Sequence, residues 1–227
     1  VRLQQIVECV DLPELKFSAF TAGMPRELLR HPAIFDSIRR GDILLHHPYQ
    51  SFQPVINFIA QAANDPQVIA IKQTVYRTGS QSMMMELLIQ AARNGKAVTV
   101  VVELMARFDE EVNINWAQRL EEAGAHVIYG VVSHKSHAKM ALVVRREGSA
   151  LRRYVHLSTG NYHARTATLY TDFGLFTCNK EICADVNEVF MSLTGLGTAN
   201  KLRHLWQAPF TLHQRMIQAI KNETRIA

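Results

Sequence analysis

Two apolar stretches decide the fold: Gln67-Val-Ile-Ala-Ile-Lys-Gln-Thr-Val-Tyr76 and Ala97-Val-Thr-Val-Val-Val-Glu-Leu104. Both are rich in β-branched residues, the pattern of strands that are buried on both faces. Between them, residues 82–93 space their apolar positions at helical intervals. Ser82 supplies an N-cap and Asn94-Gly95 a stop. A strand, a helix and a second strand in this order predict a parallel crossover unit.

The same alternation continues on both sides of this unit. Further strands are expected at Asp42–His46, Ala125–Tyr129 and Tyr170–Phe176, with helices at 52–63, 109–122, 182–193 and 212–221. Two more strands, 139–145 and 153–157, are joined by Glu147-Gly148-Ser149 and should pair as a hairpin. The sequence therefore predicts an α/β fold, a mixed sheet with helices on both faces.

Turn signals set the first 40 residues apart from the regular pattern that follows, and we divide the chain into three regions. Residues 1–40 are expected to be a remnant of a preceding head domain or linker. The main domain should span 41–200, and 201–227 should form a helical connector. Because the sequence opens with Val1 and not with Met, we expect a piece of a longer protein.

Composition narrows the class of protein only slightly. The net charge is +5 and the pI about 9.2, which suits a polyanionic substrate, nucleic acid or an acidic membrane surface equally well. Three cysteines, an odd number, argue against a disulfide framework and for a reducing compartment. No apolar run approaches the roughly 18–20 residues that cross a membrane.

Cationic and hydrogen-bonding residues follow the ends of the predicted strands. Ligands of α/β sheets gather at the carboxyl ends of strands. There the sequence places Tyr76 and Arg77, then Glu103, Arg107 and Asp109, then His134 to Lys139, and finally Ser158 to Asn161 with Arg165. Guanidinium groups grip phosphate oxygens in pairs, so this rim predicts an anionic substrate.

His137-Ala-Lys139 is the sharpest local feature of this rim. Strand periodicity puts His137 and Lys139 on one side of the chain. A neutral imidazole is a nucleophile near pH 7, and a neighbouring ammonium stabilises the charge of a transferred phosphoryl group. A histidine that only forms hydrogen bonds is the alternative.

The H-x-K pattern, followed by a strand and the turn Ser158-Thr-Gly-Asn161, resembles the half-site of the phospholipase D superfamily. In that superfamily two such halves face each other and one histidine becomes phosphorylated. The Asp usually found five residues beyond the lysine is here Val144, which disfavours a generic phosphodiesterase.

Five blocks in register resemble the long-chain polyphosphate kinase family. They are Asp42-Ile-Leu-Leu-His-His-Pro-Tyr-Gln-Ser-Phe52, Ile71-Lys-Gln-Thr-Val-Tyr-Arg77, Val102-Glu-Leu-Met-Ala-Arg107-Phe-Asp, Ser136-His-Ala-Lys139, and Leu157-Ser-Thr-Gly-Asn161-Tyr with Thr168-Leu-Tyr170-Thr-Asp172-Phe. The resemblance runs from about Asp42 to Phe190. It implies a phospholipase D-like catalytic domain.

The resemblance implies a role for individual residues. His137 matches the histidine that forms a phosphohistidine, and Lys139 assists it. Tyr170 matches a residue at the adenine nucleotide. Arg77 and Arg107 match two positions associated with the magnesium site, where a guanidinium can clamp phosphate beside the ion but cannot ligate it. Asn161 joins the substrate-binding set; Lys72 and Arg165 are weaker candidates for the polyphosphate path.

The resemblance also implies the reaction and its setting. The terminal phosphate of ATP would pass reversibly to polyphosphate through the phosphohistidine, with Mg²⁺ as cofactor. The full protein should be a homo-oligomer that binds no nucleic acid. Its expected location is the cytoplasm, or the inner face of the membrane as a peripheral protein. Without a second catalytic domain, this piece is expected to be inactive by itself.

Two rival functions stay open at this point. A phospholipase D-like phosphodiesterase would take its phosphoryl group from a diester and not from ATP. A polyanion- or nucleic-acid-binding module would carry out no chemistry, although the low aromatic content gives little support for stacking on bases.

Overall fold

Seven strands form one mixed sheet in the order β1-β7-β6-β5-β2-β3-β4. The computed structural model describes residues 12–15, 17–18, 20–76, 82–103, 110–130, 136–197 and 202–226. The strands are β1 (Ile43–His47), β2 (Val68–Val75), β3 (Ala97–Val102), β4 (His126–Tyr129), β5 (Lys139–Glu147), β6 (Ala150–Ser158) and β7 (Asp172–Thr177). β2, β3 and β4 are parallel, and the other neighbours pair antiparallel.

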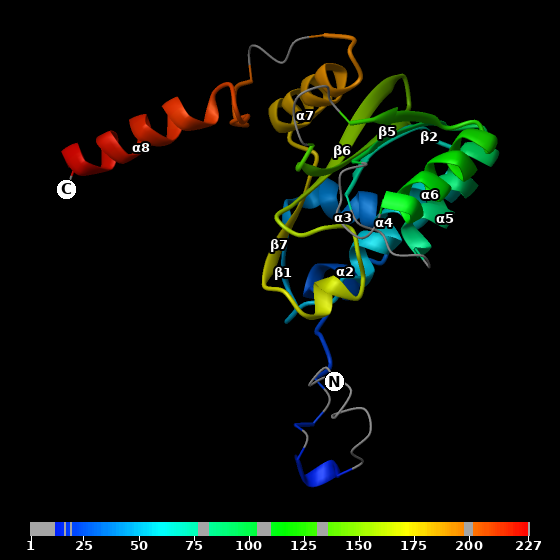
Figure 1. Cartoon of the computed structure of the whole chain (residues 1–227), viewed down its shortest axis with the longest axis horizontal. Helices are drawn as coiled ribbons and strands as arrows, with labels where there is room; N and C mark the ends of the chain where they lie inside the picture. The colour runs from blue at the N-terminus through cyan, green and yellow to red at the C-terminus, as the bar shows by residue number, and fades with distance from the viewer. Residues whose placement is uncertain are drawn as a thin grey trace.

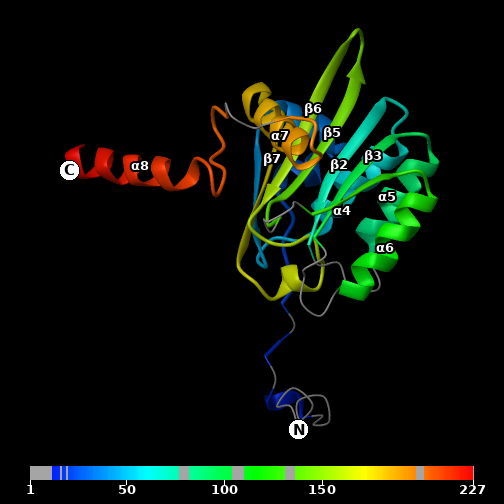
Figure 2. The same ribbon diagram turned by 45° about the horizontal axis from the view of Figure 1, so that its top comes forward.

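Helices cover both faces of the sheet. The helices of the described residues are α2 (Arg26–Arg30), α3 (Ile34–Arg40), α4 (Gln53–Asn64), α5 (Met83–Arg93), α6 (Glu110–Glu122), α7 (Lys180–Leu193) and α8 (Leu212–Ile226), with the short 3-10 turns η1 (Pro13–Leu15) and η2 (Thr166–Thr168). Figures 1 and 2 show α4, α5 and α6 on one face and α7 on the other. The predicted α/β fold and its hairpin, β5–β6, are confirmed.

The two apolar stretches form β2 and β3 at the centre of the sheet. Val100 lies in register opposite Gln73, and both are fully buried. The predicted N-cap of α5 is also present, since Ser82 Oγ accepts a hydrogen bond of 3.4 Å from the Met85 amide. Local signals and buried strands therefore agree here, which is why the sequence alone located this unit.

The face under α4, α5 and α6 holds the larger hydrophobic core, while α7 closes a smaller one. Phe58, Met85 and Leu120 are buried in the first. Val186 and Phe190 of α7 pack in the second against Met140 and Leu142 of β5. Alternate residues of β5 thus serve opposite cores, as the period of a strand requires.

The first 40 residues contain more regular structure than their turn signals suggested. Helix α3 buries Ile34, Phe35 and Ile38 in the larger core. Because α3 is only seven residues long and follows Pro32, its pattern is too short to stand out in the sequence. The division of the chain at residues 40 and 200 stays a prediction.

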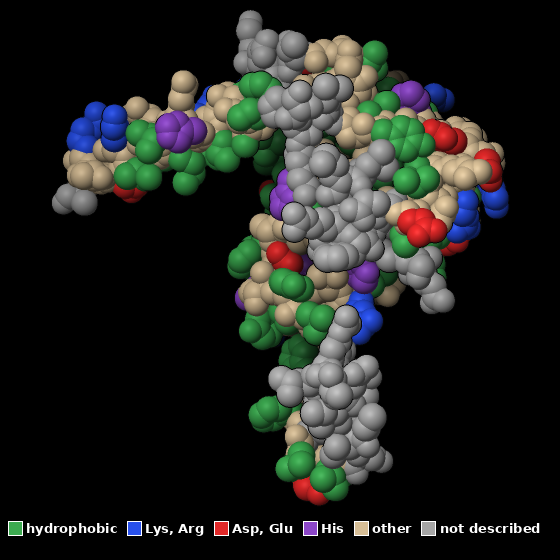
Figure 3. All heavy atoms as spheres, in the orientation of Figure 1, with side chains coloured by type: hydrophobic (Ala, Val, Ile, Leu, Met, Phe, Trp, Pro, Cys, Tyr) green, Lys and Arg blue, Asp and Glu red, His purple; other side chains and the backbone are tan. Residues whose placement is uncertain are grey.

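Helix α8 projects from the body and buries none of its residues. Leu212, Met216 and Ile220 follow one another at four-residue spacing and are 37%, 46% and 56% exposed. Figure 3 shows hydrophobic side chains along this projecting helix. No helix of the described residues is long and apolar enough to span a membrane.

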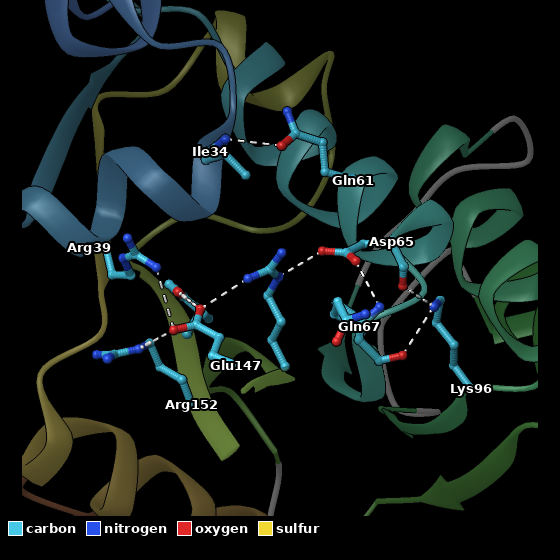
Figure 4. Close-up of polar contacts among 11 residues, drawn as sticks. Ile34, Arg39, Gln61, Asp65, Gln67, Lys96, Glu147 and Arg152 are labelled. Carbon is cyan, nitrogen blue, oxygen red and sulfur yellow. Dashed lines mark hydrogen bonds and ion pairs between the residues drawn. The ribbon is translucent and has the colours of Figure 1, made fainter. Parts of the chain in front are cut away.

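An ion-pair network ties the hairpin turn to the rest of the molecule, at the end of the sheet opposite Lys139 (Figure 4). Glu147 accepts hydrogen bonds from Arg145 at 3.2 Å, from Arg152 at 2.7 Å and from the Tyr154 hydroxyl. Arg145 also donates to Asp65 at 2.7 Å, which joins β5 to the end of α4. Burial alone would raise the pKa of Glu147, but the hydrogen bonds from Tyr154, Arg152 and Arg145 outweigh it and lower that pKa.

We predict that this network makes folding stability sensitive to acid. A carboxyl group with a lowered pKa in the folded state stabilises the fold above its unfolded-state pKa of 4.5 and loses that contribution as pH falls through the folded value. Replacing Glu147 by Gln should flatten the pH dependence of the free energy of unfolding below about pH 4.5. Urea denaturation from pH 3 to pH 7 measures this, with the exposed Glu122→Gln as control; equal slopes for wild type and Glu147→Gln would refute it.

Candidate active site

One edge of the sheet gathers the residues that the sequence placed at strand ends. β2, β3 and β4 end at this edge, and β5, which is antiparallel to β2, begins there. Lys139 lies in register opposite Ser158, and His47 opposite Asp172. We call this edge the rim, defined by Tyr76, Glu103, His137, Lys139, Ser158, Asp172 and His47.

The predicted pair His137 and Lys139 is brought into direct contact. Lys139 Nζ lies 3.0 Å from His137 Nδ1 and 2.7 Å from the His137 carbonyl oxygen. An ammonium is a donor only, so in this contact Nδ1 accepts, and a neutral ring in this arrangement would carry its proton on Nε2. Lys139 is 7% exposed, while His137 is exposed. A buried lysine therefore contacts a histidine whose side chain is exposed.

Tyr76 and Glu103 support the same pair from the ends of β2 and β3. The Tyr76 ring meets the His137 ring edge-on at 5.2 Å, and Lys139 Nζ lies 5.3 Å from the Tyr76 ring centre. Glu103 is buried, and its Oε2 accepts a hydrogen bond of 2.7 Å from the Ser136 amide. The histidine is thus held by the strand ends as well as by its own strand.

The loop that follows β6 is closed by polar contacts to β7. Thr159 Oγ1 donates to Asp172 Oδ1 at 2.8 Å. A Cβ at Gly160 would lie 2.4 Å from Asp172 Oδ2, so only glycine fits this close approach. The Asn161 Oδ1 is buried without a hydrogen-bond partner among the described residues. The predicted Ser-Thr-Gly-Asn turn therefore lies at the rim beside the histidine strand.

Tyr170 stands on the same loop, two residues before β7. Its side chain is 62% exposed, and its amide donates to Thr166 of η2 at 3.1 Å. An exposed aromatic ring on an ordered turn is available for stacking on a planar ligand.

Arg77, Arg107 and His134 lie outside the described residues, so their predicted roles stay predictions. Lys72, a weaker candidate, points to α7, where its Nζ lies 3.5 Å from Asn187 Oδ1. Burial, and then the charge of Arg153, lower the pKa of Lys72. Arg165 is exposed beyond the β6 loop.

A cavity of about 430 Å³ opens beside His137 on the α7 side of the sheet. His137, Lys139 and Ser158 form its polar end. Its other walls come from α7 and the segment 202–210, and include Leu193, Trp206 and Phe210. His137 and Lys139 therefore face a space with one polar end and mainly apolar walls.

Asp185 fixes the wall of that cavity. It is buried on α7, and its carboxylate accepts hydrogen bonds from three successive amides: Arg203 at 3.0 Å, His204 at 2.7 Å and Leu205 at 2.9 Å. Burial would raise the pKa of Asp185, but these three amide hydrogen bonds lower it. No local pattern marked the role of this carboxylate, because its partners lie about 20 residues away along the chain.

Two buried histidines, His47 of the rim and His156 on β6, were not predicted from the sequence to form a pair. His156 Nδ1 lies 2.9 Å from the Tyr162 hydroxyl, and His47 Nδ1 lies 2.9 Å from the Gln50 carbonyl oxygen. Burial, and then His47, lower the pKa of His156 to about 3, so its ring is neutral at physiological pH. Both Nε2 atoms are buried and face Gly174.

Gly174 is the residue that allows these two rings to converge. A Cβ added there would lie 2.7 Å from His156 Nε2 and 3.6 Å from His47 Nε2. We predict that Gly174→Ala destabilises the protein by about 1–3 kcal/mol, the usual cost of overpacking a core. Thermal unfolding measures this against Gly41→Ala, where the added methyl meets no atom within 4 Å. Equal melting temperatures for the two variants would contradict the prediction.

Comparisons with known proteins point to one family. A family model described as "Polyphosphate kinase C-terminal domain 1" matches residues 33–199. The chain is 63% identical over 227 residues to a polyphosphate kinase of Burkholderia ambifaria, a match that covers 98% of this chain and 33% of that protein. It resembles the crystal structure of polyphosphate kinase from Porphyromonas gingivalis with a TM-score of 0.82 and 33% identity, over 93% of this chain and 35% of that one.

A more distant match bears on the fold alone. Nuc from Salmonella typhimurium, a phospholipase D family member, superposes with a TM-score of 0.54 at 14% identity, over 69% of this chain and 95% of that chain. The expected phospholipase D-like architecture is thereby confirmed. The chain spans about a third of the length of the curated relatives that it matches.

Proposed function

Because the chain belongs to the polyphosphate kinase family, we propose that it is the part of such an enzyme that carries the phosphoryl-accepting histidine, His137. The observation that carries this proposal is the contact of 3.0 Å between Lys139 Nζ and His137 Nδ1 on an exposed rim. A nucleophile and a cation placed two residues apart are what phosphoryl transfer uses, since that reaction needs positioning and charge stabilisation more than other chemistry.

The proposed reaction has two balanced steps. In the first, an imidazole nitrogen of His137 attacks the γ-phosphorus of ATP; an N–P bond forms, the bond to the β,γ-bridging oxygen breaks, and ADP leaves. In the second, a terminal oxygen of polyphosphate attacks the same phosphorus; the N–P bond breaks and the chain is one unit longer. Both steps are reversible, since no bond is hydrolysed.

Lys139 is proposed to contact His137 before the reaction and the transferred phosphoryl group during it. At rest it holds the Nδ1 lone pair of His137. An arriving phosphoryl group offers anionic oxygens, which are stronger acceptors than a neutral ring nitrogen. The ammonium can turn to them while it keeps its 2.7 Å contact with the His137 carbonyl oxygen, and the ring is then free to attack.

We propose that the nucleotide lies along the same rim. Tyr170 would stack on the adenine, and Arg77, Arg107 and Asn161 would contact the phosphates. Among the described residues no group of three His, Cys, Asp or Glu side chains could hold a metal ion. Mg²⁺ is proposed to enter bound to the phosphates of ATP, as it commonly does in phosphoryl-transfer sites. Tyr170→Ala should raise the KM for ATP about tenfold with a smaller change in kcat, because a base-stacking contact is worth about 1–3 kcal/mol.

The remaining parts of the proposal concern the whole protein. α8 exposes an apolar stripe that a soluble helix would bury, which supports packing of residues 212–226 against a further domain of the longer enzyme. That domain is proposed to supply the second half-site. The proposed location is the cytoplasm, and the proposed partners are ATP, ADP, polyphosphate and further copies of the enzyme.

Growth of polyphosphate by the full-length protein tests the function. Purified enzyme with ATP labelled in the γ-phosphate and a short polyphosphate primer should give longer labelled polyphosphate, and ADP with polyphosphate should give ATP. Release of label from a phosphodiester substrate, without transfer from ATP, would replace this proposal by the phospholipase D-like alternative.

A further inference from the structure

The His137 segment is anchored by a chain of hydrogen bonds that begins on the far side of the core, in helix α6. Asn113 is fully buried, and its Nδ2 donates to the Tyr76 carbonyl oxygen at 3.0 Å and to the Glu103 carbonyl oxygen at 3.1 Å. One amide group therefore binds the ends of β2 and β3 together. These are the two strand ends whose side chains support His137.

Glu103 carries the anchorage from the strand end to the histidine. Its amide donates to the Val75 carbonyl oxygen at 2.9 Å, which continues the ladder of β2 and β3 by one residue. Its side chain is 4% exposed, and Oε2 accepts the Ser136 amide at 2.7 Å. A hydrogen bond to a carboxylate is about twice as strong as one between neutral groups. The residue next to His137 is thus fixed by a strong, buried contact.

The cost of burying Asn113 shows that its donors matter. Its Oδ1 is buried with no hydrogen-bond partner among the described residues, which costs about 1–3 kcal/mol. The position belongs to the stripe that α6 buries, together with Trp116, Ala117 and Leu120. An apolar side chain there would avoid the cost, so the contribution of the amide lies in its two N–H groups.

We propose that Asn113 and Glu103 are positioning residues for His137: Asn113 clamps the ends of β2 and β3, and the Glu103 carboxylate fixes the main chain of Ser136. Neither touches the transferred group. The inference rests on the proposed function, because it assumes that His137 is the group that needs placing. A displacement of about 1 Å in a reacting group costs about 10²-fold in rate, which sets the size of the expected effect.

Variants of Glu103 in the full-length enzyme separate hydrogen bonding from charge. Glu103→Gln keeps an oxygen that can accept the Ser136 amide, so phosphorylation of His137 in a single turnover with labelled ATP should slow by less than about tenfold. Glu103→Ala removes the acceptor and should slow it by about 10²-fold, with a smaller change in the apparent affinity for ATP. Asn113→Ala should resemble Glu103→Ala, and the exposed Asn115→Ala on the same helix should match wild type.

Hydrogen exchange gives a second readout that does not depend on catalysis. By mass spectrometry, the peptide containing Ser136 should exchange faster in Glu103→Ala and Asn113→Ala than in wild type, Glu103→Gln and Asn115→Ala, at a temperature at which all of these proteins are folded. If the variants show this exchange pattern but the wild-type protein takes no label from ATP, the anchorage of Ser136 is supported and only the proposed function is refuted. Unchanged exchange and unchanged labelling in Glu103→Ala would overturn the positioning role. If Glu103→Ala unfolds, Asn113→Ala decides by the same two measurements.

Discussion

Replacing His137 by Ala in the full-length enzyme should lower polyphosphate synthesis by on the order of 10⁴-fold or more. The side chain is exposed on the rim, so its removal leaves no cavity in either core. Under the proposed function, it does remove the atom to which the phosphoryl group would be attached. Without that intermediate, ATP and polyphosphate would have to react directly, with no group to carry the phosphate between them. Steady-state assays of synthesis and of the reverse reaction measure the effect.

A histidine at the other edge of the sheet provides the matched control. His126 is exposed at the start of β4, at the edge opposite the rim. His126→Ala should keep activity within about twofold and melt at the wild-type temperature, because exposed substitutions away from special features have small effects. Substantial synthesis by His137→Ala would remove His137 from the mechanism.

Replacing Lys139 by Met should lower the rate of His137 phosphorylation by about 10²- to 10³-fold, the usual cost of removing one preorganised donor from a reacting site. Methionine is similar in length and unbranched, so it can occupy the buried space. It cannot donate to His137 Nδ1 or to the oxygens of the transferred phosphoryl group. Arg at this position should not restore the rate, because its planar fork differs in shape from the ammonium.

The corresponding change on the neighbouring strand controls for the loss of a partly buried lysine. Lys72 lies on β2 in register opposite Leu142, three residues along β5 from Lys139, and its Nζ is near Asn187 of α7. Lys72→Met should leave the single-turnover rate within about threefold of wild type. Equal losses in Lys139→Met and Lys72→Met would indicate a general effect on the fold and not support of His137.

Local patterns were enough to predict the central crossover unit and to place His137 beside Lys139. β3 is almost entirely apolar, β2 is rich in β-branched residues although it contains Lys72 and Gln73, and the Ser82 cap marks the start of α5. His137 and Lys139 are two residues apart, so their contact needs no knowledge of the fold beyond the strand. Features with short sequence separation are therefore readable in advance.

The supports of the site depend on pairings that no local pattern encodes. Asn113 reaches Tyr76 across 37 positions, and Glu103 reaches Ser136 across 33. The convergence of His47 and His156 over Gly174 depends on the register of three strands. Only long-range packing brings these groups together, and a single sequence does not reveal which distant residues will pack against one another.

One of these supports did leave a trace in the sequence. Residues 113, 116, 117 and 120 form the i, i+3, i+4, i+7 stripe that α6 buries, and Asn113 is its one polar member. A buried amide at such a position must find partners, and strand ends, with their unpaired carbonyl groups, are common ones. A polar residue on the apolar stripe of a helix was thus the available sign of a clamp.

The central claim, that His137 carries the phosphoryl group, is tested most directly by locating the phosphate. Full-length wild-type enzyme is incubated with ATP, digested at alkaline pH, at which phosphohistidine is stable, and its peptides are sequenced by mass spectrometry. We predict phosphate on His137, lost when polyphosphate is added and absent from His137→Ala. Phosphate on a different residue in an active enzyme, with His137 unmodified, would contradict the claim.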